Sequence, residues 1–281
     1  MTLTIAEALR RTGDAGAGID ARVLLRHVLG CDDGYLIAHA DEALTPRQQD
    51  SFDALAARRR DGEPVAYLTG CREFFGLEFR VTQDVLIPRP ETERLVELVL
   101  ERLPQQSASR VLDLGTGSGC VAIAIARRRA RAQVLAVDCA EEAVAVAREN
   151  VGRHGARNVR VVRGDWFAAA GPEQFDVIAA NPPYVASGDP HLAAGDVRFE
   201  PRHALVAGPL GTECIAAIAA AAPAHLNPGG WLLLEHGYDQ GAAARELLRA
   251  AGFTRGVSTW QDLAGRERVS GGQVDQPVPT R

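Results

Sequence analysis

The turn Asn181-Pro182-Pro183-Tyr184 directly follows a run of apolar residues at 177–180. Proline lacks a backbone N–H and has a fixed φ, so the carbonyl groups of this turn can point into a site. The Asn181 side-chain oxygen and the Pro182 carbonyl form a pair of acceptors that matches an NH2 group, and Tyr184 would supply a flat aromatic wall. A loop that only caps a strand is the alternative, but a buried Asn side chain would then need another partner. The turn predicts a site that grips a planar amide or amino nitrogen.

A glycine-rich turn lies upstream of this element, and its residues are Gly115, Thr116, Gly117, Ser118 and Gly119. It joins an apolar run at 111–114 to a helical pattern, and glycine there permits a tight turn and the close approach of a ligand. A dinucleotide fingerprint would be Gly-x-Gly-x-x-Gly, whereas Cys120 and Val121 follow the last glycine here. A plain strand-to-helix turn is the alternative. The pattern favours a nucleoside-bearing cofactor over a dinucleotide.

Acidic and aromatic residues follow the next two predicted strands. Asp138 ends the first of them, where a carboxylate can accept hydrogen bonds from both ribose hydroxyls of a nucleoside. Its alternative role is to cap the following helix, and the two roles are compatible. Asp165 could accept from an adenine amino group and Trp166 could lie against the adenine ring; the alternative is a turn acid beside a core aromatic. Because ligands of open α/β sheets bind outside the carboxyl ends of the strands, these features together indicate a methyltransferase that acts on nitrogen.

Composition limits the other classes of function. The chain has 281 residues, of which 46% are hydrophobic and 24% charged, and its net charge is −5. Nucleic-acid binders usually carry a basic domain, so we expect no stable nucleic-acid binding. The five cysteines have no Cys-x-x-Cys spacing, which predicts reduced thiols in a cytoplasmic protein without a metal site. The N-terminus has no signal-peptide core and the apolar stretch at 215–222 is too short to span a bilayer, so we expect no membrane association.

Strand and helix patterns alternate beyond residue 110, as in a mostly parallel sheet flanked by helices. The predicted strands are residues 111–114, 134–137, 159–162, 176–180, 231–235, 254–259 and about 267–270. The predicted helices between them include residues 140–153 and 242–251. The sequence therefore predicts an α/β domain whose polar turns lie at one edge of the sheet.

The N-terminal quarter of the chain predicts only short helices. Thr45, Pro46 and Gln48 form a helix start with a capping box, and residues 64–68 predict a last short helix. The arginines at 58–60 suit the negative dipole at the end of a helix better than they suit a nucleic acid.

A hairpin is predicted between the helical and α/β parts, because residues 75–81 alternate in polarity and apolar residues follow at 85–87. We therefore expect a helical domain at 1–71, a hairpin linker at 72–88, a methyltransferase domain at 89–272 and a tail at 273–281. The tail has few anchors, which predicts disorder.

The chain resembles the bacterial release factor glutamine methyltransferases, the PrmC/HemK family, over most of its length. Beyond the two turns, the resemblance rests on residues 64–70, 72–77, 86–93, 164–167, 195–201 and 233–237. The Asn-Pro-Pro-Tyr turn alone is shared with adenine-N6 DNA methyltransferases, whereas the segments at 86–93 and 195–201 are much more specific. The chain departs from the family at residues 268–272, where the family usually has a longer last strand.

The resemblance implies a class I S-adenosylmethionine-dependent methyltransferase fold with S-adenosylhomocysteine as a product. The cofactor would be held by the glycine turn at 115–119 with Asp138, Trp166 and Asn181. The substrate would be a class 1 peptide chain release factor, whose Gly-Gly-Gln glutamine is held by residues 181–184, with the helical domain recognising the factor.

Two rival activities would use similar site chemistry. One is methylation of a glutamine in a ribosomal protein, which the helical domain disfavours. The other is methylation of adenine N6 in a nucleic acid, which would require base flipping and a clamp on the backbone. The acidic net charge counts against it, and the arginines at 127–131 end a predicted helix, where the dipole favours them.

Overall fold

The structure is a computed structural model, and it describes residues 2–11 and 17–275. The chain divides into two compact units, each with a hydrophobic core of its own. The first unit contains Met1–Cys71 and the segment Ala193–Phe199, and the second contains Arg72–Leu192 and Glu200–Arg281. Of the tail for which we predicted disorder, residues 276–281 lie outside the described part of the chain.

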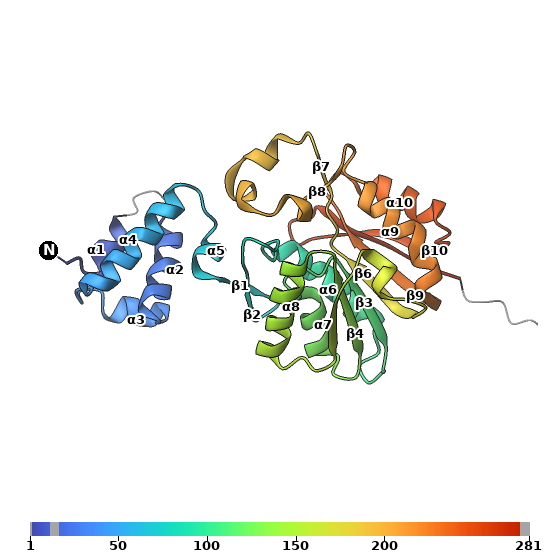
Figure 1. Ribbon diagram of the computed structural model, residues 1–281, viewed down its shortest axis with the longest axis horizontal. Coiled ribbons are helices and arrows are strands. Elements are labelled where there is room, and N and C mark those ends of the chain that lie inside the picture. The colour runs from blue at the N-terminus through green and yellow to red at the C-terminus, as the bar shows by residue number, and fades with distance from the viewer. Residues whose placement is uncertain (1, 12–16, 276–281) are drawn as a thin grey trace, which may run out of the picture. The chain divides into compact units, whose positions relative to one another are not determined.

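Short helices form the first unit. Within the described residues they are α1 (Ile5–Arg10), α2 (Ala17–Leu29), α3 (Asp33–Ala38), α4 (Pro46–Arg60) and α5 (Val65–Thr69) (Figure 1). The capping box predicted at the start of α4 is confirmed, because Thr45 accepts from the Gln48 N–H and the Gln48 side chain accepts from the Thr45 N–H. Leu24, Leu25 and Phe52 are fully buried between the helices. Capping and an apolar core thus account for a unit made of helices that are individually too short to be stable.

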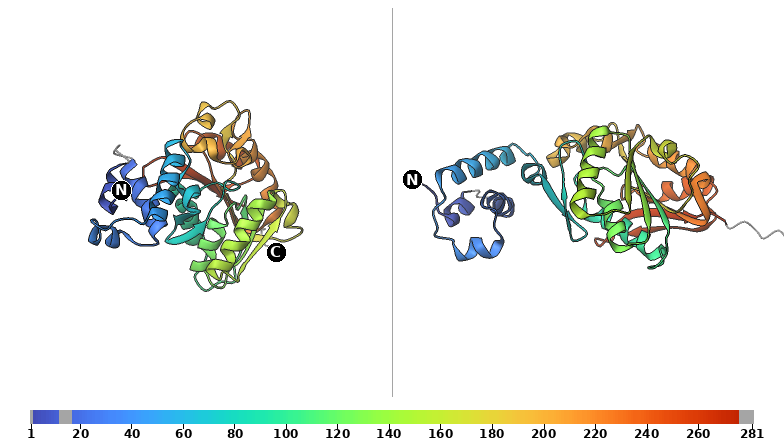
Figure 2. Two further views of the ribbon diagram at one scale, coloured as in Figure 1. Left: turned by 60° about the vertical axis from the view of Figure 1, so that its left-hand side comes forward. Right: turned by 60° about the horizontal axis from the view of Figure 1, so that its bottom comes forward.

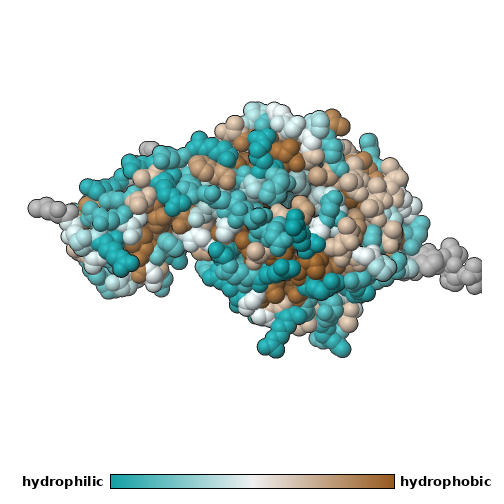
Figure 3. Space-filling model, viewed as in Figure 1, coloured by the Kyte–Doolittle hydropathy of each residue, from teal (hydrophilic) through white to brown (hydrophobic). Residues whose placement is uncertain are grey.

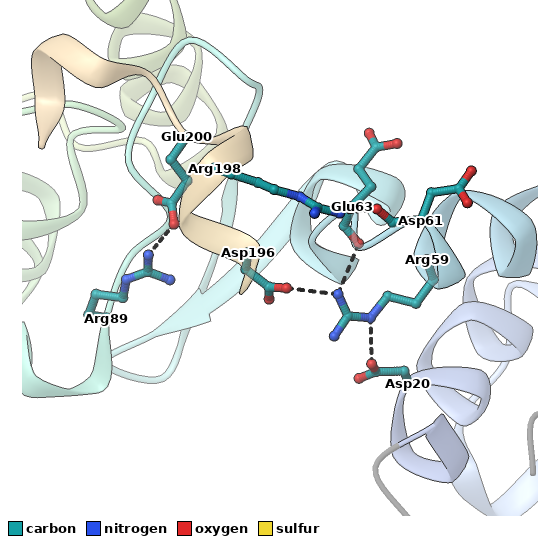
Figure 4. Close-up of polar contacts among 8 residues, drawn as sticks. All are labelled: Asp20, Arg59, Asp61, Glu63, Arg89, Asp196, Arg198 and Glu200. Carbon is teal, nitrogen blue, oxygen red and sulfur yellow. Dashed lines mark hydrogen bonds and ion pairs between the residues drawn. The ribbon is translucent and has the colours of Figure 1, made fainter. Parts of the chain in front are cut away.

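The segment Ala193–Phe199 is held within the first unit by Arg59 of α4. The Arg59 guanidinium donates from Nη1 to Asp196 Oδ1 at 2.8 Å and from Nε to Asp20 Oδ2 at 2.6 Å (Figure 4). Arg59 therefore does more than meet the helix dipole, because it joins α2, α4 and the segment.

A hairpin opens the remainder of the chain, and its strands are β1 (Cys71–Phe74) and β2 (Leu77–Arg80). The strand boundaries predicted for this hairpin are wrong. The prediction began the first strand at Phe75 and paired it with residues 85–87, which form no strand. Phe75 instead lies in the turn with a φ of 53°, and Phe74 is the buried member of the pair. The alternation of polarity therefore breaks at the turn.

A seven-stranded sheet forms the centre of the second unit, in the order β10-β11-β9-β6-β3-β4-β5 (Figure 1). Its strands are β3 (Arg110–Leu114), β4 (Gln133–Asp138), β5 (Val159–Arg163), β6 (Phe175–Ala180), β9 (Leu226–Glu235), β10 (Arg255–Gln261) and β11 (Glu267–Gln273). Within this sheet β11 runs in the opposite direction to the other six strands, and the remaining neighbouring pairs are parallel. The predicted α/β class with a mostly parallel sheet is confirmed.

Helices cover both faces of this sheet (Figures 1 and 2). On one face pack α6 (Glu93–Arg102), α7 (Cys120–Arg128) and α8 (Glu141–His154), and on the other pack α9 (Glu213–Ala221) and α10 (Gly241–Ala250). Neighbouring strand residues alternate between the two cores, so that Val111 faces the first set of helices and Leu112 the second. This burial of both faces explains why the strands are nearly continuous apolar runs.

The last strand is longer than predicted. β11 extends to Gln273, which pairs with Trp231, and its side-chain Nε2 donates to the Gly229 carbonyl at 2.6 Å. The predicted boundary of the tail at 273 is therefore wrong by at least this residue, because pairing with β9 continues past the glycines of β11.

The connection after β6 contains the short strands β7 (Val185–Ala186) and β8 (Val206–Gly208), with turns of 3-10 helix between them. Hydrophilic residues cover most of the face drawn in Figure 3, and apolar residues lie among them in small areas. Across residues 2–11 and 17–275, the helices are all too short or too polar to cross a membrane.

Candidate active site

The register of the parallel strands brings the polar turns to one edge of the sheet. At the ends of the strands, Ala180 of β6 pairs with Leu114 of β3 on one side and with Leu234 of β9 on the other. The next positions on these strands are Gly115, Asn181 and Glu235. Ligands of open α/β sheets bind outside the carboxyl ends of the strands, so this edge is the candidate site.

The glycine turn depends on its glycines for two different reasons. Gly115, Gly117 and Gly119 all have positive φ, with values of 69°, 53° and 81°. A Cβ on Gly119 would also lie 3.2 Å from Ile123 Cδ1 and 3.3 Å from Ala147 Cβ, whereas a Cβ on Gly117 would meet open space. Gly117 is therefore required by backbone conformation alone, and Gly119 also by the packing of α7 on α8.

The Asp138 carboxylate supports the glycine turn directly. Its Oδ2 accepts the Gly117 N–H at 2.8 Å and its Oδ1 accepts the Ala140 N–H at 3.0 Å. The N-cap residue of α8 is Ala140 and not Asp138. Asp138 therefore does not cap the helix itself, although it accepts a hydrogen bond from the N-cap residue. Each carboxylate oxygen has two lone pairs, and both oxygens can therefore still accept from a ribose hydroxyl.

Asp165 and Trp166 follow β5 and line the same cleft as the glycine turn. Trp166 has a left-handed φ of 43°, a conformation that costs a bulky residue about 1–2 kcal/mol. The ring lies beside the turn, since a Cβ on Gly115 would be 3.7 Å from Trp166 Cζ3. A flat ring in this position offers a surface on which a planar heterocycle can stack.

Most residues predicted to bind the cofactor line one cleft, namely Gly115, Thr116, Gly117, Ser118, Asp138, Asp165, Trp166 and Asn181. Gly119 does not line it and begins α7 behind the turn. Of the predicted substrate turn, Asn181 and Pro183 line the cleft, whereas Pro182 is buried and Tyr184 packs against the sheet core. The cleft therefore joins the glycine turn to the start of the Asn-Pro-Pro-Tyr turn.

The Asn181 side chain has one engaged end and one unpaired end. Its Nδ2 donates to Thr92 Oγ1 at 3.1 Å, while its buried Oδ1 accepts no hydrogen bond from the described residues. The Pro182 carbonyl likewise accepts none from the described part of the chain. A buried acceptor without a partner costs about 1–3 kcal/mol, so the Asn181 oxygen is suited to a ligand that brings an NH2 group.

Two buried carboxyl groups near the turns have no predicted role. Burial raises the pKa of Asp113 to about 7, against the effect of a hydrogen bond from Thr116 Oγ1 at 2.6 Å. Burial also raises the pKa of Glu235 to about 7, and a hydrogen bond with Thr92 opposes that rise. Glu235 directly follows the apolar residues 232–234, which is the same signal that singled out Asn181. This signal makes Glu235 recognisable from the sequence as well.

Two segments that carry the family resemblance meet within the second unit. The Glu200 carboxylate, only 4% exposed, accepts the Ile87 N–H at 3.1 Å and forms an ion pair with the Arg89 guanidinium (Figure 4). Arg89 lines the cleft. Glu200 thus holds Arg89, a residue of the cleft wall, from 111 positions further along the chain.

The polar groups of the cleft fit S-adenosylmethionine. A carboxylate with spare lone pairs, a flat aromatic ring and a glycine turn match a ribose, an adenine and a closely approaching amino-acid chain. Asn181, whose side-chain oxygen is buried and unpaired within the described residues, lines the same cleft. With its mostly parallel sheet and single antiparallel strand β11, the protein is a class I S-adenosylmethionine-dependent methyltransferase.

Comparisons with known proteins agree with this class. The family model of the PrmC N-terminal domain matches residues 4–70, and that of the methyltransferase small domain matches residues 92–200. The crystal structure of a methyltransferase from Pyrococcus furiosus is similar over 78% of this chain and 97% of that chain, with a TM-score of 0.54. Its sequence identity of 20% means that this likeness supports the fold alone.

Curated relatives narrow the class to one family. A release factor glutamine methyltransferase from Xylella fastidiosa strain Temecula1 is 51% identical over 255 residues, which cover 91% of this chain and 92% of the relative. The protein of that name from Burkholderia pseudomallei strain K96243 is 50% identical and covers 96% of each chain. The one from Escherichia coli strain K12 is 46% identical and covers 92% of each. The chain belongs to the release factor glutamine methyltransferase family.

Proposed function

We propose that this protein transfers a methyl group from S-adenosylmethionine to the side-chain amide nitrogen, N5, of a glutamine in a class 1 peptide chain release factor. The observation that carries the proposal is the buried Asn181 Oδ1, which accepts no hydrogen bond from the described residues and belongs to a residue that lines the cleft with the glycine turn. The identity of the substrate is inferred from the family to which the chain belongs. The target is the glutamine of a Gly-Gly-Gln loop, because glycines without side chains let a loop enter a narrow cleft.

The acceptors of the Asn181 turn prepare a weak nucleophile. An amide nitrogen reacts poorly because its lone pair is delocalised into the carbonyl. Asn181 Oδ1 and the Pro182 carbonyl accept the two hydrogens of the substrate NH2, which orients the nitrogen and stabilises the positive charge that develops on it. Holding the nitrogen in line with the methyl group supplies a further part of the rate enhancement.

The bound cofactor supplies the methyl group on a sulfonium, whose sulfur keeps the electrons of the broken S–C bond in the product S-adenosylhomocysteine. The nitrogen lone pair forms the new N–C bond, and one amide proton then passes to water. No side-chain base is required for these steps.

The residues around the cleft hold the cofactor in this proposal. Asp138 accepts from the ribose hydroxyls, Asp165 accepts from the adenine amino group, and Trp166 stacks on the adenine ring. The backbone of residues 115–119 approaches the remainder of the cofactor. The Tyr184 ring has no role in this proposal, because it packs against the sheet core instead of lining the cleft.

The helical first unit has the role of recognising the release factor in this proposal, and the protein acts in the cytoplasm, where translation ends. Stable binding of nucleic acid is not expected, because the net charge of −5 is unsuited to a polyanion.

The test is methyl transfer from labelled S-adenosylmethionine to three substrates side by side: an intact release factor, a ribosomal protein and DNA. We expect one added methyl group on the glutamine of the Gly-Gly-Gln loop, located by mass spectrometry of the loop peptide. The control is a release factor with that glutamine replaced by alanine, which should take up no label. Asparagine at that position should react poorly, because positioning errors of about 1 Å can cost 10²-fold in rate.

Each outcome of this test has a clear meaning. Label on the ribosomal protein or on DNA, with the release factor unmodified, would overturn the proposal. Label on Gln273 of the enzyme itself would reveal self-modification; the hydrogen bond of its Nε2 to the Gly229 carbonyl disfavours this outcome.

A further inference from the structure

The Gln240 side chain, at the start of α10, contacts the end of the Asn-Pro-Pro-Tyr turn. Gln240 occupies the N-cap position of α10, but its side chain makes no capping hydrogen bond to that helix. Its Nε2 instead donates to the Tyr184 carbonyl at 2.9 Å and to the Gly211 carbonyl at 3.2 Å, and its Oε1 accepts the Gly237 N–H at 2.8 Å. One side-chain amide therefore joins three separate stretches of the second unit.

The three partners determine the orientation of the Gln240 amide. A backbone N–H can only donate a hydrogen bond, and a backbone carbonyl can only accept one. The Gly237 N–H therefore requires the amide oxygen, and the carbonyls of Tyr184 and Gly211 require the two hydrogens of the NH2 group. A reversed amide would place its oxygen against two carbonyl oxygens and lose all three hydrogen bonds.

Gly211 brings its backbone close to the same contact. A Cβ at this position would lie 2.8 Å from the Tyr184 carbonyl oxygen and 3.0 Å from Gln240 Nε2. The first distance is shorter than Cβ atoms adopt, so a side chain here would displace the carbonyl or the amide. Gly211 also has a φ of 79°, in the left-handed region that favours glycine. Glycine therefore leaves the space that the contact between Gln240 and the turn requires.

The Asn-Pro-Pro-Tyr turn is held at both ends. Asn181 directly follows β6, whose last residue Ala180 is paired with a strand on each side. At the other end the Tyr184 carbonyl accepts from Gln240, and no backbone N–H of the described residues donates to this carbonyl. The two prolines of the turn fix φ at two positions, so a displacement of the Tyr184 carbonyl also moves the oxygens of Asn181 and Pro182.

We propose that Gln240 is a positioning residue that holds the Asn-Pro-Pro-Tyr turn in the geometry required for methyl transfer. This inference rests on the proposed function, in which the Asn181 and Pro182 oxygens accept the substrate NH2. Gln240 does not line the cleft, so it acts through the turn. Positioning errors of about 1 Å can cost 10²-fold in rate, so loss of this contact should lower turnover and leave cofactor binding intact.

Gln240→Glu is the first test, because it exchanges the NH2 group for an oxygen and keeps the size of the side chain. One oxygen can still accept from Gly237, whereas the other would face the carbonyls of Tyr184 and Gly211 and repel them. With intact release factor as substrate at pH 8, kcat should fall by about tenfold or more. The cofactor Kd from calorimetry and the KM for the release factor should each stay within about threefold, since Gln240 does not line the cleft and the first unit is assigned to recognition of the factor.

The matched control for this exchange is Gln273→Glu. The Gln273 Nε2 also donates to a backbone carbonyl, that of Gly229 at 2.6 Å. Gln273 pairs with Trp231, however, whereas β9 reaches the edge of the candidate site only at Glu235. The same exchange of atoms there should leave kcat unchanged. An equal loss of kcat in both variants would mean that an added charge on the fold is sufficient, and would overturn the inference.

Gly211→Ala is the second test and leaves Gln240 in place. Its Cβ would displace the Tyr184 carbonyl, so kcat should again fall by about tenfold or more while the cofactor Kd is unchanged. The control for backbone strain is Gly265→Ala, in the turn between β10 and β11. Gly265 has a φ of 75°, but a Cβ there would meet open space, so kcat should be unchanged.

The double variant Gln240→Glu/Gly211→Ala shows whether the two changes act on one contact. Changes at independent sites have effects that multiply in rate, whereas changes that break the same contact do not. We therefore expect kcat of the double variant to lie within about twofold of the lower of the two single variants.

Loss of kcat in Gln240→Glu and Gly211→Ala, with KM and cofactor Kd retained and both controls unchanged, supports the inference. Unchanged kcat in Gln240→Glu, a cofactor Kd that weakens by the same factor as kcat, or losses that multiply in the double variant overturn it. If Gln240→Glu does not fold, the comparison of Gly211→Ala with Gly265→Ala decides alone. Failure of the proposed function is distinguishable, because the wild-type protein would then not methylate the release factor at all.

Discussion

The turns after β3 and β6 occupy equivalent positions on adjacent parallel strands, yet they are built in opposite ways. The turn at 115–119 is rich in glycine, and its first N–H groups are engaged within the protein, by the Val137 carbonyl and by Asp138. The turn at 181–184 has two prolines and two oxygens that accept no hydrogen bond from the described residues. The backbone of the first turn is therefore held by the protein itself, although its Ser118 hydroxyl has no partner among the described residues, whereas the second turn leaves acceptor oxygens unpaired.

We infer from this difference that cofactor binding belongs to the turn after one strand and the chemistry to the turn after its neighbour. A turn whose backbone is held from within the protein gives a preformed surface, on which substitutions should change cofactor affinity or stability. A turn with unpaired acceptors gives a preorganised electrostatic site, on which substitutions change turnover. Each prediction below tests whether this division holds.

The largest effect is expected for Asn181→Ala. Loss of the unpaired oxygen should lower turnover of the release factor by about 10²-fold or more, the scale seen when one preorganised polar group is removed. Much of the cofactor affinity should remain, as measured by calorimetry. If the cofactor Kd weakens by the same factor as kcat, the two turns do not differ in role and the comparison fails.

Asp138→Ala should act on the other side of the comparison. Removal of hydrogen bonds to the ribose hydroxyls, each worth roughly 1.5–3 kcal/mol when one partner is charged, should weaken cofactor binding by about tenfold or more. Turnover at saturating cofactor should change less. The control is Asp53→Ala, an exposed acid on α4. Unchanged affinity in a folded Asp138→Ala variant would remove this residue from the site.

Gly119→Ala and Gly117→Ala form a matched pair for the two demands on the glycine turn. Both place a Cβ at positive φ, which costs roughly 1–2 kcal/mol, but only the Cβ at Gly119 would crowd Ile123 and Ala147. Thermal unfolding should therefore show a larger loss of stability in Gly119→Ala, by about 1 kcal/mol. Equal losses would contradict the packing explanation.

The smallest effect is a change of slope with pH. The folded pKa of Asp113, about 7, lies above the ordinary value of 3.8, so the folded state binds this proton more tightly. The contribution to stability is therefore fully present below about pH 4 and is lost as the pH rises towards 7, by at most about 1.4 kcal/mol per pH unit. Urea unfolding of Asp113→Asn should show a flatter dependence in this window, and an unchanged slope would assign the proton elsewhere.

Local signals in the sequence predicted much of the fold. The capping box at Thr45 is contained within four residues, and the apolar runs of the central strands are long enough to be recognised. The prediction of the hairpin boundaries failed because Phe74 and Phe75 are chemically equivalent neighbours, and nothing in the sequence distinguishes which of them lies in the turn. β11 was predicted too short because its glycines are poor strand formers that pairing with β9 nevertheless holds in place.

The candidate site was predictable where one residue carries its own signal. Asp138 and Asn181 each follow an apolar strand, and polar residues at strand ends are visible in the sequence. The contact of Thr92 with Asn181 was not predictable, since it spans 89 positions and the local context of Thr92 suggests only a helix cap. Contacts of this kind are specified by tertiary structure.

The helical first unit is not a single stretch of chain, because Ala193–Phe199 belongs to it. Arg59 and Asp196, which are 137 positions apart, meet inside this unit at 2.8 Å. A chimera that takes the helices from a relative must take this distant segment from the same relative, because otherwise the contact between Arg59 and Asp196 is lost. A substitution that changes the packing of this unit therefore involves two separate stretches of the sequence.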